Sequence, residues 1–257
     1  MKLTVIGGSA ACPNPGDAGS SYLVTHDGFS LVLDTGPDSI SKLRQHAELR
    51  SIGAVIISHL HSDHTLDLVP FRYGLRYIRG QRGPRIPLWM PPGGRSFLDQ
   101  LGCVFALGAE STEPFFDGEF DIHEYDSNSS LAFGPFSVAF MPTQHFIDCW
   151  AMRLEAGGRR LAYLADSAPI DELVDFACDA DVAICEATLS EEEAGAPENS
   201  GHMTARQAGE IAQRAGVGHL VLTHLWAEHD LESTMCEARA AFTGAITIAA
   251  SGVQVVV

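Results

Sequence analysis

Four side chains that could hold metal ions lie within six residues of the chain. His59, His61, Asp63 and His64 directly follow the strand pattern at 54–58. Imidazole and carboxylate groups together suit zinc, iron or manganese. Two histidines two residues apart on an extended turn can point the same way, whereas the adjacent Asp63 and His64 diverge as a helix begins. The spacing therefore predicts two metal ions instead of one. The alternative is a polar surface loop with accidental histidines. Three histidines and one aspartate at this spacing after a buried strand are, however, hard to obtain by chance.

Three further ligand candidates occupy equivalent places in the pattern. His145, Asp166 and His224 each lie just past an apolar run that predicts a strand. Because strand ends can meet at one edge of a sheet, all three could converge there. Taken alone, each is more simply a cap or a hydrogen-bonded polar residue, and it is the shared position that favours the ligand interpretation.

A candidate for acid–base chemistry comes from a different segment. His202 precedes the predicted helix 204–215 and follows the segment Cys185-Glu186-Ala187-Thr188. An imidazole near a metal site can transfer a proton during catalysis. The remaining histidines sit in predicted turns or at element ends and are interpreted as surface groups: His26, His46, His123, His219 and His229.

The elements that position these residues are predicted from hydrophobic periodicity. Continuous apolar runs at 54–58 and 182–186 predict strands covered on both faces, and turns at 27–28 and 157–158 predict two hairpins. Helices are predicted at 39–46, 65–78, 95–101, 169–177 and 204–215. The order of these elements favours an α/β fold of two sheets with helices outside them. No internal repeat or linker divides the chain, so one domain, 1–257, is predicted.

Composition and charge narrow the class of protein. Of the 257 residues, 46% are hydrophobic, which is ordinary for a globular protein. A net charge of −17 leaves few basic residues for phosphate contacts, so no nucleic-acid partner is expected. The six cysteines form no C-x-x-C pair and are interpreted as reduced core thiols. The sequence shows neither a signal-peptide pattern nor an apolar run of about 18–20 residues, so we predict a cytoplasmic protein that does not bind membranes.

The motifs described above resemble those of one known superfamily. The H-x-H-x-D-H motif at 59–64 resembles the metallo-β-lactamase superfamily. Within it, the E-A-T segment at 186–188, His202-Met203-Thr204 and Leu222-Thr223-His224 are similar to the ribonuclease Z branch. The similarity spans nearly the whole chain and is greatest to short single-domain relatives, some of which, including the mycobacterial type, are cyclic-nucleotide phosphodiesterases. The resemblance implies an αββα sandwich, with two mixed sheets and helices on the outer faces.

The resemblance also implies a role for each motif position. Seven positions match metal ligands: for the first ion His59, His61 and His145, for the second Asp63, His64 and His224, and between the two Asp166. Asp63, His202 and Glu186 are the catalytic candidates, in which His202 touches the phosphate or assists the leaving oxygen and Glu186 lies behind it. Asp34 matches a strand-end aspartate that braces the metal-binding histidines. The implied cofactors are two divalent metal ions, with zinc favoured and manganese or iron as alternatives.

The substrate is predicted from what the sequence lacks. The ribonuclease Z enzymes that cut tRNA carry a long basic arm between the third metal histidine and the bridging aspartate, and here a predicted hairpin nearly fills that interval. A small phosphodiester, foremost a 3′,5′-cyclic nucleotide, is therefore expected, attacked by a hydroxide that bridges two metals. The alternatives are a tRNA 3′-endonuclease, which would need an exosite, and a lactonase or other carbonyl hydrolase, which would leave Glu186 and His202 unexplained. A non-catalytic binding module would be expected to have lost ligands.

Two further expectations concern contacts. Aromatic residues near the motifs could stack on a base, although core packing is the favoured interpretation: Trp226, Phe146, Phe71 and Tyr73. Enzymes of the resembled branch are usually dimers, so a homodimer is expected. The helix 65–78 is its candidate contact because it mixes apolar and arginine positions.

Overall fold

The computed structural model describes residues 1–79, 83–106, 114–126, 128–196 and 199–257. Within these residues, the first sheet has seven strands in the order β14-β1-β2-β3-β4-β5-β6. Their bounds are β1 (Lys2–Gly7), β2 (Ser21–His26), β3 (Phe29–Leu33), β4 (Ala54–Ile56), β5 (Ile86–Met90), β6 (Phe120–Glu124) and β14 (Gln254–Val256). Strands β14 to β3 pair antiparallel and strands β3 to β6 pair parallel, so the sheet is mixed.

The second sheet is formed by the later part of the chain. Its order in the described residues is β13-β12-β11-β10-β9-β8-β7. The bounds are β7 (Leu131–Phe133), β8 (Phe136–Pro142), β9 (Trp150–Ala156), β10 (Arg159–Tyr163), β11 (Val182–Glu186), β12 (His219–Thr223) and β13 (Ala245–Ile248). Here β7 to β10 are antiparallel and β10 to β13 parallel.

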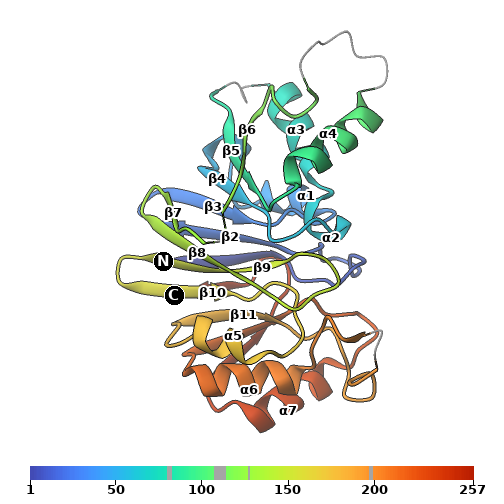
Figure 1. The fold of residues 1–257 in the computed structure, drawn as a ribbon, viewed down its shortest axis with the longest axis vertical. Coiled ribbons are helices and arrows are strands. Elements are labelled where there is room, and N and C mark those ends of the chain that lie inside the picture. Colours follow the sequence, from blue (N-terminus) through green and yellow to red (C-terminus); the bar gives the residue numbers. More distant parts are fainter. Residues whose placement is uncertain (80–82, 107–113, 127, 197–198) are drawn as a thin grey trace.

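Helices cover the outer face of each sheet (Figure 1). Those of the first sheet are α1 (Ser39–Leu43), the short 3₁₀ helix η1 (Leu49–Ser51), α2 (Ser62–Thr65), α3 (Leu68–Tyr77) and α4 (Gly94–Phe105). Those of the second sheet are α5 (Asp171–Phe176), α6 (Ala205–Ala215) and α7 (Leu231–Ala241). The fold is therefore the αββα sandwich predicted from the sequence. In the residues described, no helix is both long and apolar enough to cross a membrane.

The apolar runs explain why the sheets stack in this way. In β3, Leu31 and Leu33 pack in the core between the two sheets, whereas Val32 packs under the outer helices. In β4, Ile56 faces the inner core and Val55 the outer one. Because successive side chains point to opposite faces, a strand covered on both sides must be apolar at every position.

Several features of the structure differ from the sequence prediction. The predicted helix 65–78 is two helices, α2 and α3, because the chain turns at Asp67. The Asp67 carboxylate accepts a hydrogen bond from the backbone N–H of Ile40 (2.8 Å), and its own N–H donates to Thr35 (3.0 Å). Of the six cysteines only Cys149 and Cys185 are buried, so the prediction of core thiols is wrong for the other four, which lie exposed on the surface. Helix α7 and strand β7 are not among the predicted elements. Helix α7 starts at a side-chain cap, where Asp230 accepts from the N–H groups of Glu232 and Ser233.

Candidate metal centre

Sharp turns after three strands bring polar side chains to one edge of the sandwich. Asp34 follows β3 with φ 58°, Ala165 precedes Asp166 after β10 with φ 53°, and His224 follows β12 with φ 57°. Positive φ is uncommon for residues other than glycine and costs free energy. That three such residues lie at one edge indicates that the local backbone is held in this form by the surrounding structure.

The structure brings the seven predicted ligands together in two groups. In the first, the Nδ1 atom of His61 lies 3.2 Å from Nε2 of His59 and 3.1 Å from Nε2 of His145. The candidate ligand atoms of each group all lie within 4.8 Å of one another. The second group consists of Asp63, His64, Asp166 and His224.

Asp166 lies between the two groups. Its Oδ2 atom is 3.4 Å from Nε2 of both His64 and His224, and it is 3.7 Å from His59 and 3.9 Å from His145. One carboxylate oxygen thus faces histidines of both groups. This position suits a carboxylate that bridges two metal ions.

The outward nitrogens of these histidines are held by hydrogen bonds. Nδ1 of His59 lies 3.0 Å from Ser58 Oγ, Nδ1 of His145 lies 2.9 Å from the carbonyl oxygen of Gly201, and Nδ1 of His224 lies 2.7 Å from Thr188 Oγ1. A histidine fixed at one nitrogen presents the other nitrogen to a metal in a defined orientation. This arrangement aims Nε2 of each of these three histidines at the cluster.

Asp34 holds a fourth histidine, His64, by its Nδ1 atom in the same way. Its fully buried carboxylate accepts from the N–H of Ser58 (2.6 Å), the hydroxyl of Ser58 (2.7 Å) and the hydroxyl of Tyr163 (2.6 Å), and lies 2.8 Å from Nδ1 of His64. The sequence analysis identified Asp34 but not Ser58 or Tyr163, whose contributions depend on tertiary contacts.

One buried atom tests whether this site suits a metal ion. Nε2 of His64 is shielded from solvent and has no hydrogen-bond partner among the described residues. Buried polar atoms are nearly always paired, so an unpaired imidazole nitrogen facing two carboxylates requires an explanation. A divalent ion coordinated there would satisfy it, and the mixed imidazole and carboxylate donors match the preferences of zinc, iron and manganese.

The electrostatics of the cluster favour the same conclusion. Burial lowers the pKa of His59 well below its usual value, which keeps its imidazole neutral. Burial alone would raise the pKa of Asp166, but the charges of His224 and His64 lower it on balance, so this carboxylate is ionised. Burial opposes a charge on His64, yet Asp166 and Asp34 raise its pKa well above the usual value. A metal ion bound by these carboxylates would displace that proton.

A second carboxylate–histidine pair lies beside the cluster. Nδ1 of His202 is 2.9 Å from Oε1 of Glu186. Glu186 also accepts from the N–H of Ser167 (2.7 Å) and from the hydroxyl of Thr188 (2.6 Å), which itself contacts His224. Burial lowers the pKa of His202, but the hydrogen bond and charge of Glu186 outweigh it and raise the pKa. Glu186 thus orients the imidazole of His202 and favours its protonated form.

The local sequence explains the position of His202. Helix α6 begins three residues later, after a capping box in which Thr204 accepts from the N–H of Gln207 and the Gln207 side chain accepts from the N–H of Thr204. This exchange of hydrogen bonds fixes the start of the helix. His202 therefore stays in the extended segment before α6, facing the strand ends.

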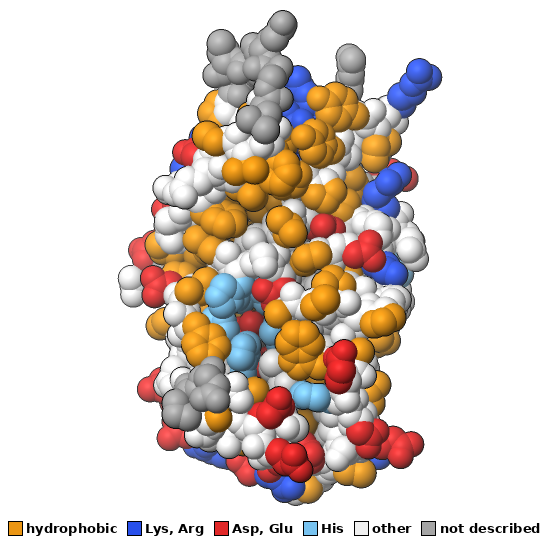
Figure 2. Space-filling view, turned by 90° about the vertical axis from the view of Figure 1, so that its right-hand side faces the viewer, with side chains coloured by type: hydrophobic (Ala, Val, Ile, Leu, Met, Phe, Trp, Pro, Cys, Tyr) orange, Lys and Arg blue, Asp and Glu red, His pale blue; other side chains and the backbone are white. Residues whose placement is uncertain are grey.

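The surface around the cluster is recessed and partly apolar. Figure 2 shows histidine and acidic side chains gathered in a hollow, with hydrophobic side chains on both sides of it. A neighbouring cavity of about 320 Å³ is lined by His202, Gln144 and Asn199 among others. The five other histidines take no part in the potential metal groups of the described residues.

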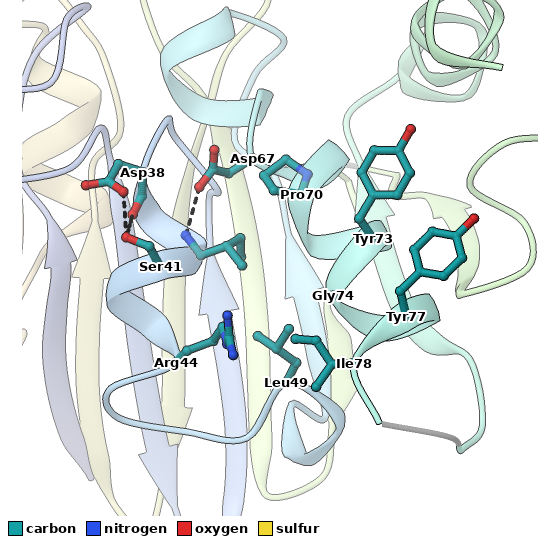
Figure 3. A pocket seen from close by; sticks show the side chains of 11 residues that line it. Asp38, Ser41, Arg44, Leu49, Asp67, Pro70, Tyr73, Gly74, Tyr77 and Ile78 are labelled. Atoms are coloured by element: carbon teal, nitrogen blue, oxygen red, sulfur yellow. Dashed lines mark hydrogen bonds between the residues drawn. The ribbon is translucent and has the colours of Figure 1, made fainter. Parts of the chain in front are cut away.

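A separate groove lies between α1 and α3 (Figure 3). It has a volume of about 620 Å³, and its apolar side includes Leu49, Tyr73 and Tyr77. The two tyrosine rings stack at 5.9 Å, and Tyr77 is 68% exposed. The groove is lined by none of the seven candidate ligands, so it is distinct from the metal centre.

Comparison with known proteins identifies the class. A model described as a beta-lactamase superfamily domain matches residues 30–225. Together with the two sheets and the His/Asp cluster at their edge, this match shows that the chain belongs to the metallo-β-lactamase superfamily of metal-dependent hydrolases.

Individual relatives refine this placement. The chain is 32% identical to the probable metallo-hydrolase YhfI of Bacillus subtilis (strain 168), over 98% of each protein. The crystal structure of YhfI, a metallo-beta-lactamase fold protein, superposes with a TM-score of 0.88 and covers 99% of this chain and 98% of that one. A ribonuclease Z of Haloferax volcanii is 25% identical over 98% of this chain and 93% of its own length. The predicted superfamily, branch and fold are thus confirmed.

Proposed function

We propose that this protein hydrolyses a small phosphodiester, foremost a 3′,5′-cyclic nucleotide, with two divalent metal ions. The observation that carries the proposal is the His202–Glu186 pair placed beside the metal cluster. Cleavage of a phosphodiester releases an alkoxide oxygen, which departs more readily when an acid protonates it. A carbonyl hydrolase that opens an ester with a good leaving group has less need of such a pair.

The seven clustered side chains would hold the metal ions. Their first group supplies His59, His61 and His145, and their second supplies Asp63, His64 and His224, with Asp166 between the two. When bound, two divalent ions would neutralise phosphoryl charge and lower the pKa of a water molecule to near 7. Zinc is the ion we favour.

His202 would act on the leaving oxygen. Because Nδ1 is held by Glu186, Nε2 is the atom left to face the substrate, and the candidate ligand atoms of His202, His145 and Asp166 lie within 4.8 Å of one another. Glu186 raises the pKa of His202 and so keeps a proton available at Nε2. Glu186 acts through His202 and is a positioning residue in this scheme.

A small substrate is supported by the loop between His145 and Asp166. Residues 143–149 lead directly into β9, and β9 and β10 form a hairpin that leads to Asp166. This fully described interval thus has no room for a basic arm that could grip RNA. The net charge of −17 also opposes a large polyanion. The similarity to ribonuclease Z keeps tRNA 3′-end cleavage as the competing function.

A panel of substrates tests the proposal. Purified, metal-analysed protein should hydrolyse 3′,5′-cyclic nucleotides and bis-p-nitrophenyl phosphate faster than a lactone or a precursor tRNA. His202→Ala should keep its metal and lose turnover on cyclic nucleotides by roughly 10²–10⁴, with a smaller loss on the p-nitrophenyl ester, whose leaving group needs little protonation. His123→Ala is the matched control, because His123 pairs with Asp121 (3.0 Å) on β6 and not with the cluster. Preferred cleavage of the lactone or of the tRNA would overturn the proposal.

We also propose that two copies associate through the face formed by α1 and α3. The support is the exposed, stacked tyrosine pair along the groove, since large exposed apolar patches mark interaction surfaces. Arg72, on the same helix, packs its guanidinium against the rings of Tyr73 and Phe115. Arginine and tyrosine are both enriched where proteins meet.

A further inference from the structure

An aromatic ring stands exposed at the rim of the metal centre. Phe146 directly follows His145, and 51% of its surface is exposed. Its ring centroid lies 5.1 Å from that of His145 and 5.6 Å from that of His202. Of the aromatic residues considered for base stacking, Phe71 is fully buried, so for that residue core packing is correct.

A glycine leaves room for the Phe146 ring. A Cβ atom at Gly201 would lie 2.8–3.0 Å from three carbons of the ring, which is closer than packed atoms approach. Gly201 does not have a positive φ, so its backbone conformation does not demand glycine. The lack of a side chain instead gives room for Phe146. The same Gly201 accepts the hydrogen bond of His145, so ring and metal cluster share one support.

The exposed ring is suited to a particular kind of substrate group. The two neighbouring imidazoles meet the ring at 57° and 64°, tilted and edge-on, and do not stack flat on it. A planar, uncharged group that stacks on such a ring gains dispersion energy and removes apolar surface from water. In a nucleotide the sugar separates the phosphate from the base, so with the phosphate held at His202 the base can reach Phe146.

We propose that Phe146 stacks on the nucleobase of the substrate and sets a preference for nucleotides over other phosphodiesters. This inference rests on the proposed phosphodiesterase function and adds the residue that recognises the base of the substrate. Base–aromatic stacking is sequence-tolerant because every base has a π face. Phe146 therefore selects for the presence of a base and does not distinguish one base from another.

Ligand binding separates this inference from the function itself. Calorimetry on the metal-loaded protein should show tighter binding of adenosine 5′-monophosphate than of ribose 5-phosphate. Phe146→Ala should weaken the binding of adenosine 5′-monophosphate by about 5- to 150-fold and leave the binding of ribose 5-phosphate unchanged. Phe146→Trp should retain the preference for adenosine 5′-monophosphate. Phe105→Ala is the control, since Phe105 is 40% exposed at the end of α4 and away from the cluster.

The outcomes have distinct meanings. Equal binding of both ligands by the wild type, or a Phe146→Ala protein that keeps the preference, overturns the stacking role. A loss of metal in Phe146→Ala also overturns it, because the ring would then only support His145. If the preference depends on Phe146 while no phosphodiester is hydrolysed, the stacking stands and the proposed function fails.

Discussion

The substitution Asp34→Asn should separate the structural role of this carboxylate from its role in metal binding. Asparagine has the same shape and tolerates the left-handed conformation that Asp34 adopts (φ 58°), so the backbone need not move. The amide, however, offers an acceptor on one side only. Asp34 receives Ser58 N–H on Oδ1 and three groups on Oδ2: Ser58 Oγ, Tyr163 OH and His64 Nδ1.

Either orientation of the amide leaves a conflict. If its NH₂ takes the place of Oδ1, it faces the backbone N–H of Ser58. Two donors then meet and a buried N–H stays unpaired, which costs about 1–3 kcal/mol of stability. If the NH₂ takes the place of Oδ2, it donates to Nδ1 of His64. The imidazole must then carry its proton on Nε2, the nitrogen that lies in the cluster. The second case removes a ligand atom, and loss of such a partner typically lowers metal affinity about 10- to 100-fold.

The assay combines a chelator competition for zinc with urea unfolding of the metal-free protein. We expect Asp34→Asn to weaken metal binding by about 10- to 100-fold and to lower the free energy of unfolding by about 1–3 kcal/mol. Asp17→Asn is the matched control, because Asp17 also accepts four hydrogen bonds, from Gly8, Ser9 and Ser251, none of them a candidate ligand. An Asp34→Asn protein destabilised like the control but with unchanged zinc affinity would refute the reasoning.

Two further predictions concern the metal centre, and a third concerns the face formed by α1 and α3. Elemental analysis should find about two metal ions per chain and about one in His64→Ala, whereas His219→Ala should keep both; a metal-free wild type that added metal does not activate would contradict the assignment. Burial lowers the pKa of His202 but Glu186 raises it overall, so Glu186→Gln should lower that pKa. Because a general acid must be protonated, the high-pH limb of kcat/KM should then move to lower pH, and an unmoved limb would point to another donor. Light scattering should show a dimer that Tyr77→Asp converts to a monomer, and a monomeric wild type at micromolar concentration would refute the proposed interface.

The sequence indicates which side chains lie close together because these residues obey a local rule. His59, His145, Asp166 and His224 each come shortly after an apolar run, and a strand covered on both faces is readable from such a run. Once the runs are placed in two sheets with parallel neighbours, their ends must meet at one edge. The structure shows all seven side chains there.

What the sequence could not show depends on tertiary contacts. The hydroxyl of Tyr163 reaches Asp34 from the other sheet, and nothing in the apolar pattern of β10 distinguishes it from a core residue. The break between α2 and α3 arises from bonds of Asp67 to Ile40 and Thr35, in another part of the chain. Phe146 and Phe71 both lie near motifs, yet one is exposed and the other buried, a difference that only the packing of their surroundings determines.

Strand β14 has a topological consequence. It returns from the second sheet to pair antiparallel with β1, matching Lys2 with Val256, and the N–H of Val257 donates to Met1 (3.0 Å). The two marked ends consequently lie close together (Figure 1). Termini so placed permit circular permutation.

A permutant opened at Ser129-Ser130, between β6 and β7, would reorder the chain in an instructive way. Strands β7 to β13 would come first, and β14, β1 and the strands to β6 would follow in the order in which they already lie in the first sheet. The pairing of β14 with β1, now the most distant in sequence, would become a hairpin. Mean contact separation would fall, and folding should be faster at unchanged architecture. The same sandwich can therefore be threaded by the chain in a second order, and in both orders each sheet supplies side chains to both groups of the metal centre.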